Sequence, residues 1–305
     1  MDTEIKEQKK GFIATVKHIY ETKYKLLLAI TLFIFFLALV QIGYQVATTG
    51  DFVQKGVSIK GGLTITIISD KNLDYNSISK ELQNQLGKDT AVKLVTIGSK
   101  TSFIIESGIN DKDAVEKFVS QVEKITGMKR NTFSIEVTGP SLGQTFFRDT
   151  ITALIIAFIA MGAVVFLYFR IPIPSLAVML SASADILITL AVVNLLGIKL
   201  STAGIVAFLL LIGYSVDTDM LLTIKVLKRK EGKTMDRVYG ALKIGTMMTF
   251  ASLAAVLVGL LFSRSEVITQ IMLILLIGLF VDLFTTWIQN VGLLRLYLEK
   301  KGKHD

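Results

Sequence analysis

The 305-residue sequence has no cysteine and only two histidines, His18 and His304, which stand close to the two ends of the chain. Without cysteine the chain can form no disulfide, no thiolate nucleophile and no zinc site of the cysteine type. A histidine-based metal or catalytic site is not expected either. No Walker-type phosphate loop is found, so ATP hydrolysis is not expected. We therefore expect neither a metal nor a cofactor, and we expect the chain not to be an enzyme.

Charged residues are scarce in six long segments, and these segments decide the class of protein. A membrane-spanning helix needs about 20 largely apolar residues. The spans that meet this requirement are 26–46, 149–169, 174–196, 201–224, 244–263 and 267–294. The apolar part of the first span is longer than the roughly 7–15 residues of a cleaved signal peptide, so we expect it to be a permanent membrane helix. The sequence therefore predicts a multi-pass α-helical membrane protein with six transmembrane helices.

The basic residues behind the net charge of +8 are unevenly distributed. They gather before the first span, in the loop 225–243 and in the tail 295–305, whereas the short loops of the other side hold only Lys199 and Arg264. Basic residues near span ends favour the cytoplasmic side. We therefore expect a cell-membrane protein with cytoplasmic termini and with residues 47–148 outside. Topology and contact with membrane lipids account for the basic excess, so nucleic acid is not an expected partner.

The N-terminal region 1–25 has an amphipathic pattern. Residues 5–20 place apolar side chains on one helical face and lysines on the other. This pattern favours a helix that lies on the inner surface of the membrane. A frayed basic tail is the alternative that the pattern leaves open.

Residues 47–148 form the long polar block of the chain. Alternating β-branched residues predict strands, and apolar residues at helical spacing predict helices. The predicted elements are a strand at 57–68, a helix at 74–86, strands at 91–97 and 101–106 joined by a turn at 98–100, a helix at 111–125 and a strand at 132–137. This β-α-β-β-α-β order predicts an external α+β domain of the ferredoxin-like type. The block has no catalytic constellation, which favours a binding or mechanical module.

Four carboxylates interrupt the apolar spans, and no lysine or arginine lies within those spans. They are Asp185 in the third span, Asp217 and Asp219 in the fourth, and Asp282 in the sixth. A charge at the centre of a membrane helix costs roughly 2.5–3.5 kcal/mol, so such residues indicate function. We interpret the four as an ion or proton pathway, in which Asp217 is the most sensitive member. Structural hydrogen bonds between helices are the alternative.

The two carboxylates of the fourth span are expected to have different surroundings. Residues two apart on a helix point about 200° apart, so Asp217 and Asp219 cannot share a face. One is expected to face the interior of the bundle, and the other a partner helix or the inner water boundary. In the third span, the small residues Ala177, Ser181 and Ala184 predict that Asp185 faces protein rather than lipid.

Three short motifs stand out in the sequence: Gly213-Tyr214-Ser215-Val216-Asp217 in the fourth span, Gly139-Pro140 before the second span, and Gly61-Gly62 near the start of the external domain. Together they resemble the motifs of the SecD/SecF protein-export family, a branch of the RND transporter superfamily. One span, a long external domain and five further spans also follow the order of the family. The form Asp217-Thr218-Asp219 resembles archaeal members. The resemblance covers nearly the whole chain and is strongest over residues 137–230.

The resemblance implies a partner and a task. The implied partner is SecD, of similar topology, so that six spans are half of a twelve-span unit. The implied task is an accessory one, in which the Sec translocon channel is helped to move secreted precursor proteins outward across the cytoplasmic membrane. Bacterial members are thought to use proton flow, with the aspartate that matches Asp217 as a carrier. They also have an intramembrane arginine near the start of the fifth span, where this chain has Ile244.

Two other classes of function remain as alternatives. The first is an RND-type exporter half-subunit for small molecules or lipids; such exporters usually carry two external loops in a much longer chain, which disfavours this class. The second is an intramembrane aspartyl protease that uses Asp185 and Asp217. Such proteases pair a Tyr-Asp motif with a Gly-x-Gly-Asp motif, and neither motif stands at these positions.

Overall fold

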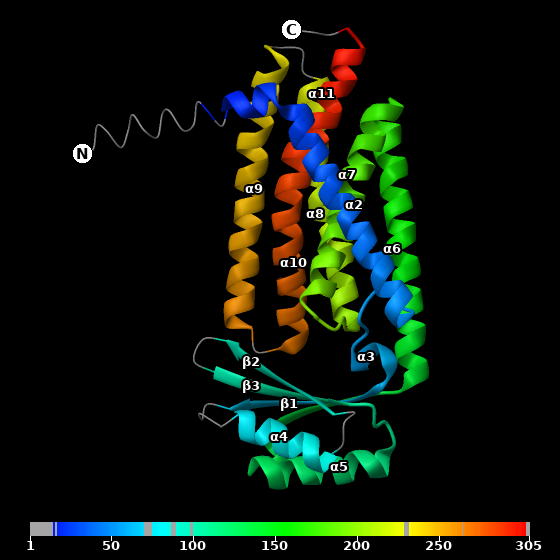
Figure 1. The fold of residues 1–305 in the computed structure, drawn as a ribbon, viewed down its shortest axis with the longest axis vertical. Helices are drawn as coiled ribbons and strands as arrows, with labels where there is room; N and C mark the ends of the chain where they lie inside the picture. Colours follow the sequence, from blue (N-terminus) through cyan, green and yellow to red (C-terminus); the bar gives the residue numbers. More distant parts are fainter. Residues whose placement is uncertain are drawn as a thin grey trace, which may run out of the picture.

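The protein consists of a bundle of long helices with a small α/β domain at one end (Figure 1). The computed structural model describes residues 15, 17–69, 75–86, 90–97, 100–228, 232–263 and 265–302. Within these residues, six helices are long and apolar enough to cross a membrane. The predicted multi-pass helical fold with a separate α+β domain between the first two spans is confirmed.

The spanning helices are longer than the apolar windows of the sequence. They are α2 (Tyr24–Thr49), α6 (Pro140–Phe169), α7 (Pro172–Leu195), α8 (Thr202–Leu227), α9 (Thr234–Phe262) and α10 (Glu266–Phe284). The last span continues through a π-helix, η2 (Thr285–Asn290), into α11 (Val291–Lys300). Capping residues set several ends: Pro140 opens α6, and the Ser201 side chain accepts a hydrogen bond from the backbone of Gly204.

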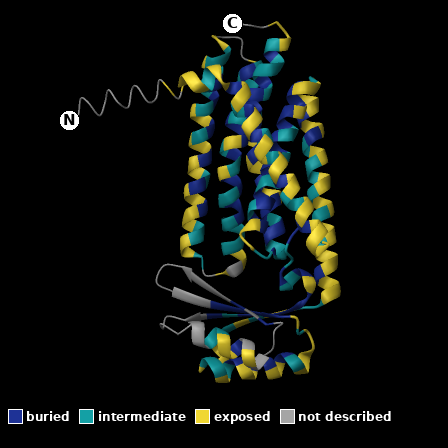
Figure 2. Ribbon diagram, viewed as in Figure 1, coloured by how far each residue is buried: buried dark blue, intermediate teal, exposed yellow. Residues whose placement is uncertain are grey.

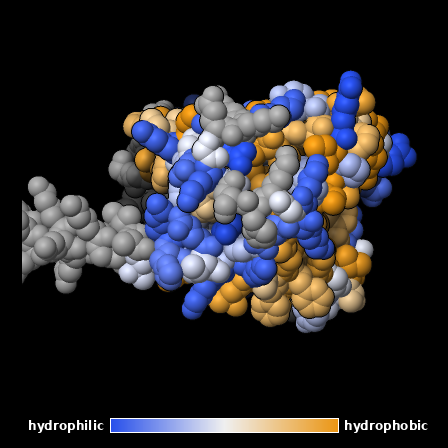
Figure 3. All heavy atoms as spheres, turned by 90° about the horizontal axis from the view of Figure 1, so that it is seen from above, coloured by the Kyte–Doolittle hydropathy of each residue, from blue (hydrophilic) through white to orange (hydrophobic). Residues whose placement is uncertain are grey.

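Helices α7 and α8 form the centre of the bundle, and the other spans surround them. In the most apolar window of each helix, 61% of α7 is buried compared with 17% of α2 and 11% of α6. The outer helices present large apolar side chains on their outward faces, such as Phe33, Ile156 and Phe250 (Figure 2). Seen from the end that carries the termini, hydrophilic residues cover the end of the bundle and hydrophobic residues lie along its flanks (Figure 3). This distribution suits a bundle surrounded by lipid.

The external domain is a four-stranded sheet covered on one face by two helices. Its elements are β1 (Gly62–Ser69), α4 (Tyr75–Leu86), β2 (Ala91–Ile97), β3 (Lys100–Ser107), α5 (Lys112–Thr126) and β4 (Phe133–Thr138). All neighbouring strands are antiparallel, in the order β2-β3-β1-β4. Leu63, Ile65 and Ile67 on β1 and Phe103 and Ile105 on β3 alternate into the core beneath α4 and α5. This is the arrangement of a split βαβ domain, as the element order predicted.

The predicted strand at 57–68 is wrong over its first four residues. Val57–Lys60 form a short helix, α3, and the strand starts only at Gly62. Two glycines end the helix: Gly61 has φ +88°, and a Cβ there would lie 2.5 Å from Cα of Pro140. The β-branched pattern misled the prediction because Ile59 packs into the bundle core instead of the sheet. Residues 98 and 99 of the expected turn and most of the amphipathic segment 5–20 lie outside the described residues, and Lys100 is already the first residue of the following strand, β3.

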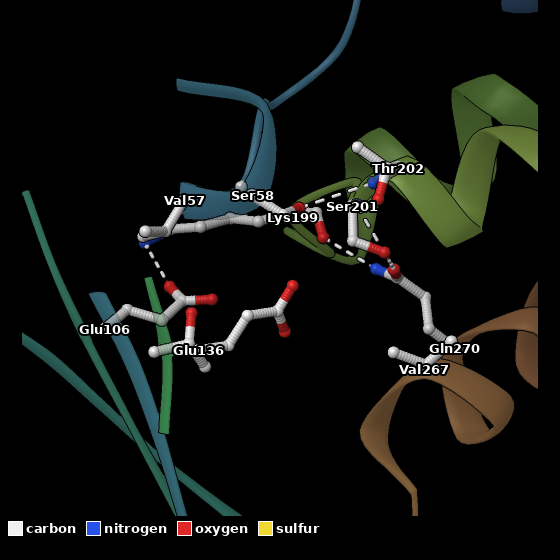
Figure 4. A pocket seen from close by; sticks show the side chains of 11 residues that line it. Val57, Ser58, Glu106, Glu136, Lys199, Ser201, Thr202, Val267 and Gln270 are labelled. Carbon is white, nitrogen blue, oxygen red and sulfur yellow. Dashed lines mark hydrogen bonds and ion pairs between the residues drawn. The ribbon is translucent and has the colours of Figure 1, made fainter. Parts of the chain in front are cut away.

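A network of hydrogen bonds joins the external domain to the bundle. Gly56 donates to the carbonyl of Leu200 at 2.8 Å, and the amide of Leu200 donates to Gln54 at 2.6 Å. The Lys199 ammonium lies 3.1 Å from the Glu106 carboxylate on β3, and Gln270 of α10 donates to the Lys199 carbonyl at 2.7 Å (Figure 4). These bonds place the uncovered face of the sheet against the ends of the helices.

Candidate functional site

Three of the four intramembrane carboxylates lie together in the middle of the bundle. Asp185 of α7 and Asp219 of α8 have no exposed surface, and Asp282 of α10 is 1% exposed. The small residues Ala177, Ser181 and Ala184 are buried with them, so the prediction that Asp185 faces protein is confirmed. In the described structure, the buried polar and charged residues include no lysine or arginine. The three carboxyls are therefore a site without a basic counter-ion.

Neutral donors surround Asp185 and Asp282. The Ser215 and Thr285 hydroxyls each donate to Asp185. The Thr286 hydroxyl donates to Asp282 at 3.0 Å, and the Thr218 hydroxyl lies 3.2 Å from the same carboxyl. Because hydroxyls carry no charge, these bonds orient the carboxyls without balancing a negative charge.

Asp219 differs from the other two because only one of its oxygens is bonded. The Asn290 side-chain amide donates to Oδ1 at 2.7 Å. Oδ2 makes no hydrogen bond of normal geometry within the described residues, and the same is true of Oδ1 of Asn290. A buried polar oxygen without a partner is costly, and a charged one is more so. A proton or a small cation at Asp219 Oδ2 would remove this cost.

The described residues contain no group of three acidic, histidine or cysteine side chains placed to hold one metal ion. The three carboxyls are thus spread over a hydrogen-bonded chain of groups rather than gathered round one point. Such an arrangement suits protons, or a cation held by one carboxylate and neutral oxygens, better than a divalent metal that needs several carboxylates.

Four site residues were not predicted from the sequence: Thr218 on α8, and Thr285, Thr286 and Asn290 on η2. Thr285 and Thr286 follow Asp282 at spacings of three and four, and they begin a polar run, Thr285-Thr286-Trp287-Ile288-Gln289-Asn290, inside the sixth apolar segment. That run was the signal that could have revealed the three residues on η2. The π-helical turn itself has no clear mark in the sequence.

Asp217 lies apart from this site, on an exposed face of α8. The same face carries Leu210, Gly213 and Tyr214, and Tyr214 is 44% exposed. A Cβ built on Gly213 would meet no atom within 4 Å, so the face is open there. The residues of the Gly213–Asp217 motif therefore lie on different faces of α8. Ser215 points to the buried carboxyls and Val216 is half-buried. The exposed face carries Gly213, Tyr214 and Asp217.

The other motif residues meet at the junction of bundle and external domain. Gly61 packs directly on Pro140, as described above. Gly62, with φ +143°, lies against the backbone of Ser107: a Cβ there would be 2.3 Å from the Ser107 carbonyl oxygen. Gly139 is the N-cap of α6. These four residues therefore fix the place where α3, β1 and α6 meet and the sheet leaves the bundle.

Comparison with known proteins gives one consistent family. The model of "Protein export membrane protein SecD/SecF, C-terminal" matches residues 117–300. Protein-export membrane protein SecF of Pyrococcus furiosus is 36% identical over 94% of this chain and 95% of its own length. SecF of Methanocaldococcus jannaschii is 33% identical over 90% of this chain and 96% of its own.

A solved structure supports the fold. SecDF of Thermus thermophilus, described as a translocon-associated membrane protein, superposes with a TM-score of 0.70 at 19% identity. The match covers 91% of this chain but spans only 38% of that longer chain. The chain belongs to the SecD/SecF family of protein-export membrane proteins.

Proposed function

We propose that the chain is an accessory subunit of the Sec protein-export machinery, working with SecD and the Sec translocon channel on secreted precursor proteins. The observation that carries this proposal is similarity to archaeal SecF proteins over nearly the full length of both chains. No catalytic residues are assigned, and the proposed role is non-enzymatic. The RND-type exporter of small molecules or lipids stays as the alternative, without an observation that favours it.

The proposed ion-carrying element is the buried set Asp185, Asp219 and Asp282. Its support is the combination of three buried carboxyls, neutral donors only, and an unpaired oxygen on Asp219. Like charges at close range oppose one another in a medium of low dielectric. The set is therefore expected to hold at least one proton or small cation, and loss or gain of that ion would change its charge inside the membrane.

Asp217 is proposed to lie at the interface with SecD. Its support is the exposed face of α8, where a carboxylate turned to lipid would cost roughly 2.5–3.5 kcal/mol. A second membrane subunit on this face would cover Asp217 and supply polar partners or water. The fact that the chain spans 38% of the Thermus SecDF chain fits a unit that needs a second half. Asp217 would then extend the ion pathway to the subunit boundary.

The proposed orientation places both termini in the cytoplasm and the α/β domain outside. The end of the bundle that carries the termini also carries Lys225, Lys228 and Arg295, of which Lys228 lies 3.6 Å from the ring centre of Tyr168. Basic and aromatic residues at that level suit contact with lipid headgroups on the inner side. Membrane lipids are therefore included among the proposed partners.

Two matched substitutions test the ion-carrying role in cells that depend on this chain. Asp219→Asn and Asp217→Asn keep size and hydrogen bonding but cannot ionise. We expect both variants to co-purify with SecD in mild detergent at the normal level and to lose export of a reporter precursor. Asp149→Asn, at an exposed carboxylate of α6, is the control and should export normally.

The outcomes separate the two carboxylates. Normal export by a well-assembled Asp219→Asn complex would exclude the buried set as an ion carrier. Normal export by Asp217→Asn alone would limit the pathway to the buried set. If SecD fails to co-purify with the unmodified chain in mild detergent, the assignment of the partner is wrong.

A further inference from the structure

The π-helix η2 supplies hydrogen bonds to all three buried carboxyls. Thr285 bonds Asp185, Thr286 bonds Asp282 and Asn290 bonds Asp219. A π-turn contains one residue more than an α-turn; such turns are rare, and they occur frequently at functional sites. If η2 changed to an α-helix, the residues after the change would rotate by about 100° and shift by about 1.5 Å. Asn290, at the end of η2, would then leave Asp219.

An N-terminal strap, residues 17–25, crosses the end of the bundle and contacts η2 directly (Figure 1). The Tyr20 hydroxyl donates to the carbonyl of Trp287, inside η2, at 2.6 Å. Burial raises the pKa of Tyr20 well above its ordinary value, so the hydroxyl keeps its proton and remains a donor at neutral pH. The strap thus satisfies a main-chain acceptor of the π-turn from outside the helix.

The strap also fixes the rotation of α11, which follows η2. Arg295 donates to the carbonyl of Glu21 at 2.9 Å and to that of Tyr20 at 3.3 Å, and its guanidinium lies 3.9 Å from the ring centre of Tyr24. The Tyr24 hydroxyl donates to Glu299, near the end of α11. These contacts would be lost if α11 rotated with a change of η2. They therefore favour the π conformation over the α conformation.

The π conformation of η2 also leaves one buried polar group, the Trp287 indole N–H, without a hydrogen-bond partner in the described structure. The Trp287 side chain is 4% exposed and lies against Gly245 of α9, where a Cβ would be 2.3 Å from Cζ2. Its indole Nε1 is buried and has no hydrogen-bond partner within the described residues. An unpaired buried N–H disfavours the arrangement that creates it. The strap contacts therefore favour the π conformation, and the unpaired indole N–H opposes it.

We propose that η2 is a two-register switch, which the N-terminal strap holds as a π-helix through Tyr20 and Arg295. In the π register Asn290 bonds Asp219; on release of the strap η2 becomes α-helical and Asn290 withdraws. The effect of the switch on export rests on the proposed ion-carrying role of Asp219. The existence of the two registers does not depend on that ion-carrying role.

Tyr20→Phe tests the switch because it removes one hydroxyl and keeps the ring. Tyr44→Phe is the matched control: it also removes one phenolic hydroxyl, but from an exposed position on α2 outside the strap. The readout is hydrogen–deuterium exchange of the η2 amides in the full chain. Losing one hydrogen bond should raise the opening equilibrium, and so the exchange rate, by roughly 2- to 10-fold. Tyr44→Phe should leave the η2 rate unchanged.

Trp287 is the single tryptophan of the chain, so its fluorescence reports on η2 alone. Tyr20→Phe combined with Arg295→Gln should shift its emission to the red and increase quenching by acrylamide. Unchanged η2 exchange and unchanged emission in this double variant would overturn the switch, even if Asp219→Asn blocks export. Faster η2 exchange together with normal export by Asp219→Asn would keep the switch and refute the ion-carrying role.

Discussion

Replacing Asn290 by leucine should destabilise the protein through Asp219 rather than through packing. Leucine is close to asparagine in size but donates no hydrogen bond. The 2.7 Å bond from Asn290 to Asp219 Oδ1 would be lost, and Oδ2 is already unpaired, so a fully buried carboxyl would keep no partner of normal geometry within the described structure. Leaving a buried acceptor without its hydrogen-bond partner costs about 1–3 kcal/mol. We expect a loss of that size for Asn290→Leu.

The double variant Asp219→Leu/Asn290→Leu tests whether the loss of stability comes from the Asn290–Asp219 pair. Removing both polar partners leaves no unpaired carboxyl, and replacing a buried polar or ionic pair by apolar residues of similar volume is often close to neutral. We therefore expect the double variant to be more stable than Asn290→Leu. The coupling between the two positions should be about 1–3 kcal/mol, in the range measured for residues in direct contact.

Thermal unfolding of the purified chain in detergent, followed by the fluorescence of Trp287, gives the four midpoints of this cycle. A loss of about 1 kcal/mol lowers the midpoint by roughly 2–4 °C in chains of 150–250 residues, and by somewhat less in longer ones. Asp217→Leu is the control, since Asp217 is exposed and should change the midpoint little. If the losses of the two single variants simply add, Asn290 and Asp219 do not form a coupled pair and the reasoning is wrong.

Three further predictions concern topology and the α/β domain. In this cysteine-free chain, a cysteine at Asn76 should react with an impermeant maleimide from outside and one at Lys228 only from inside; the reverse pattern would contradict the proposed orientation. Residues 50–140 expressed alone should give the dispersed amide spectrum of a folded α/β domain, whereas a collapsed or purely helical spectrum would contradict independent folding. This domain should also lose a little stability as pH falls below 4.5, the ordinary pKa of a glutamate, because Arg130 lowers the pKa of Glu116 in the folded state and protonation breaks that pair; Arg130→Gln should remove this pH dependence.

The sequence was sufficient to predict the elements whose pattern is local. Span lengths, the β-α-β-β-α-β order and the burial of Asp185 follow from hydrophobic runs, alternation and a stripe of small residues. The sequence could not show which of Asp217 and Asp219 faces the interior of the bundle, because both faces of α8 are largely apolar. Only the packing of α7 and α10 decides that Asp219 is the inner one.

The π-turn and α3 were missed for a related reason. Both depend on contacts between segments far apart in the sequence. α3 ends where Gly61 packs against Pro140. η2 contains Trp287, whose carbonyl accepts a hydrogen bond from Tyr20, 267 positions earlier in the sequence. Val57 and Ile59 have strand propensity, and Thr285 and Thr286 are poor helix formers, but tertiary contacts override such preferences. The functional residues of η2 were visible only as polar residues in an apolar run.

Because the Gly213–Asp217 motif is divided over two faces of α8, the same short motif can contribute to both of the proposed roles, ion carrying and contact with a partner subunit. Ser215 orients Asp185 inside the bundle, while Gly213 leaves the outer face open beside Asp217. Thr218 bonds back to the Ser215 carbonyl at 2.9 Å and reaches Asp282, so a movement of α8 changes the inner carboxyl set and the outer face together. A subunit docked on the outer face would therefore contact the same helical turn that holds the buried carboxyls. On this reasoning, docking of SecD and the ionic state of the inner set are linked, and each should alter the equilibrium of the other by the same factor.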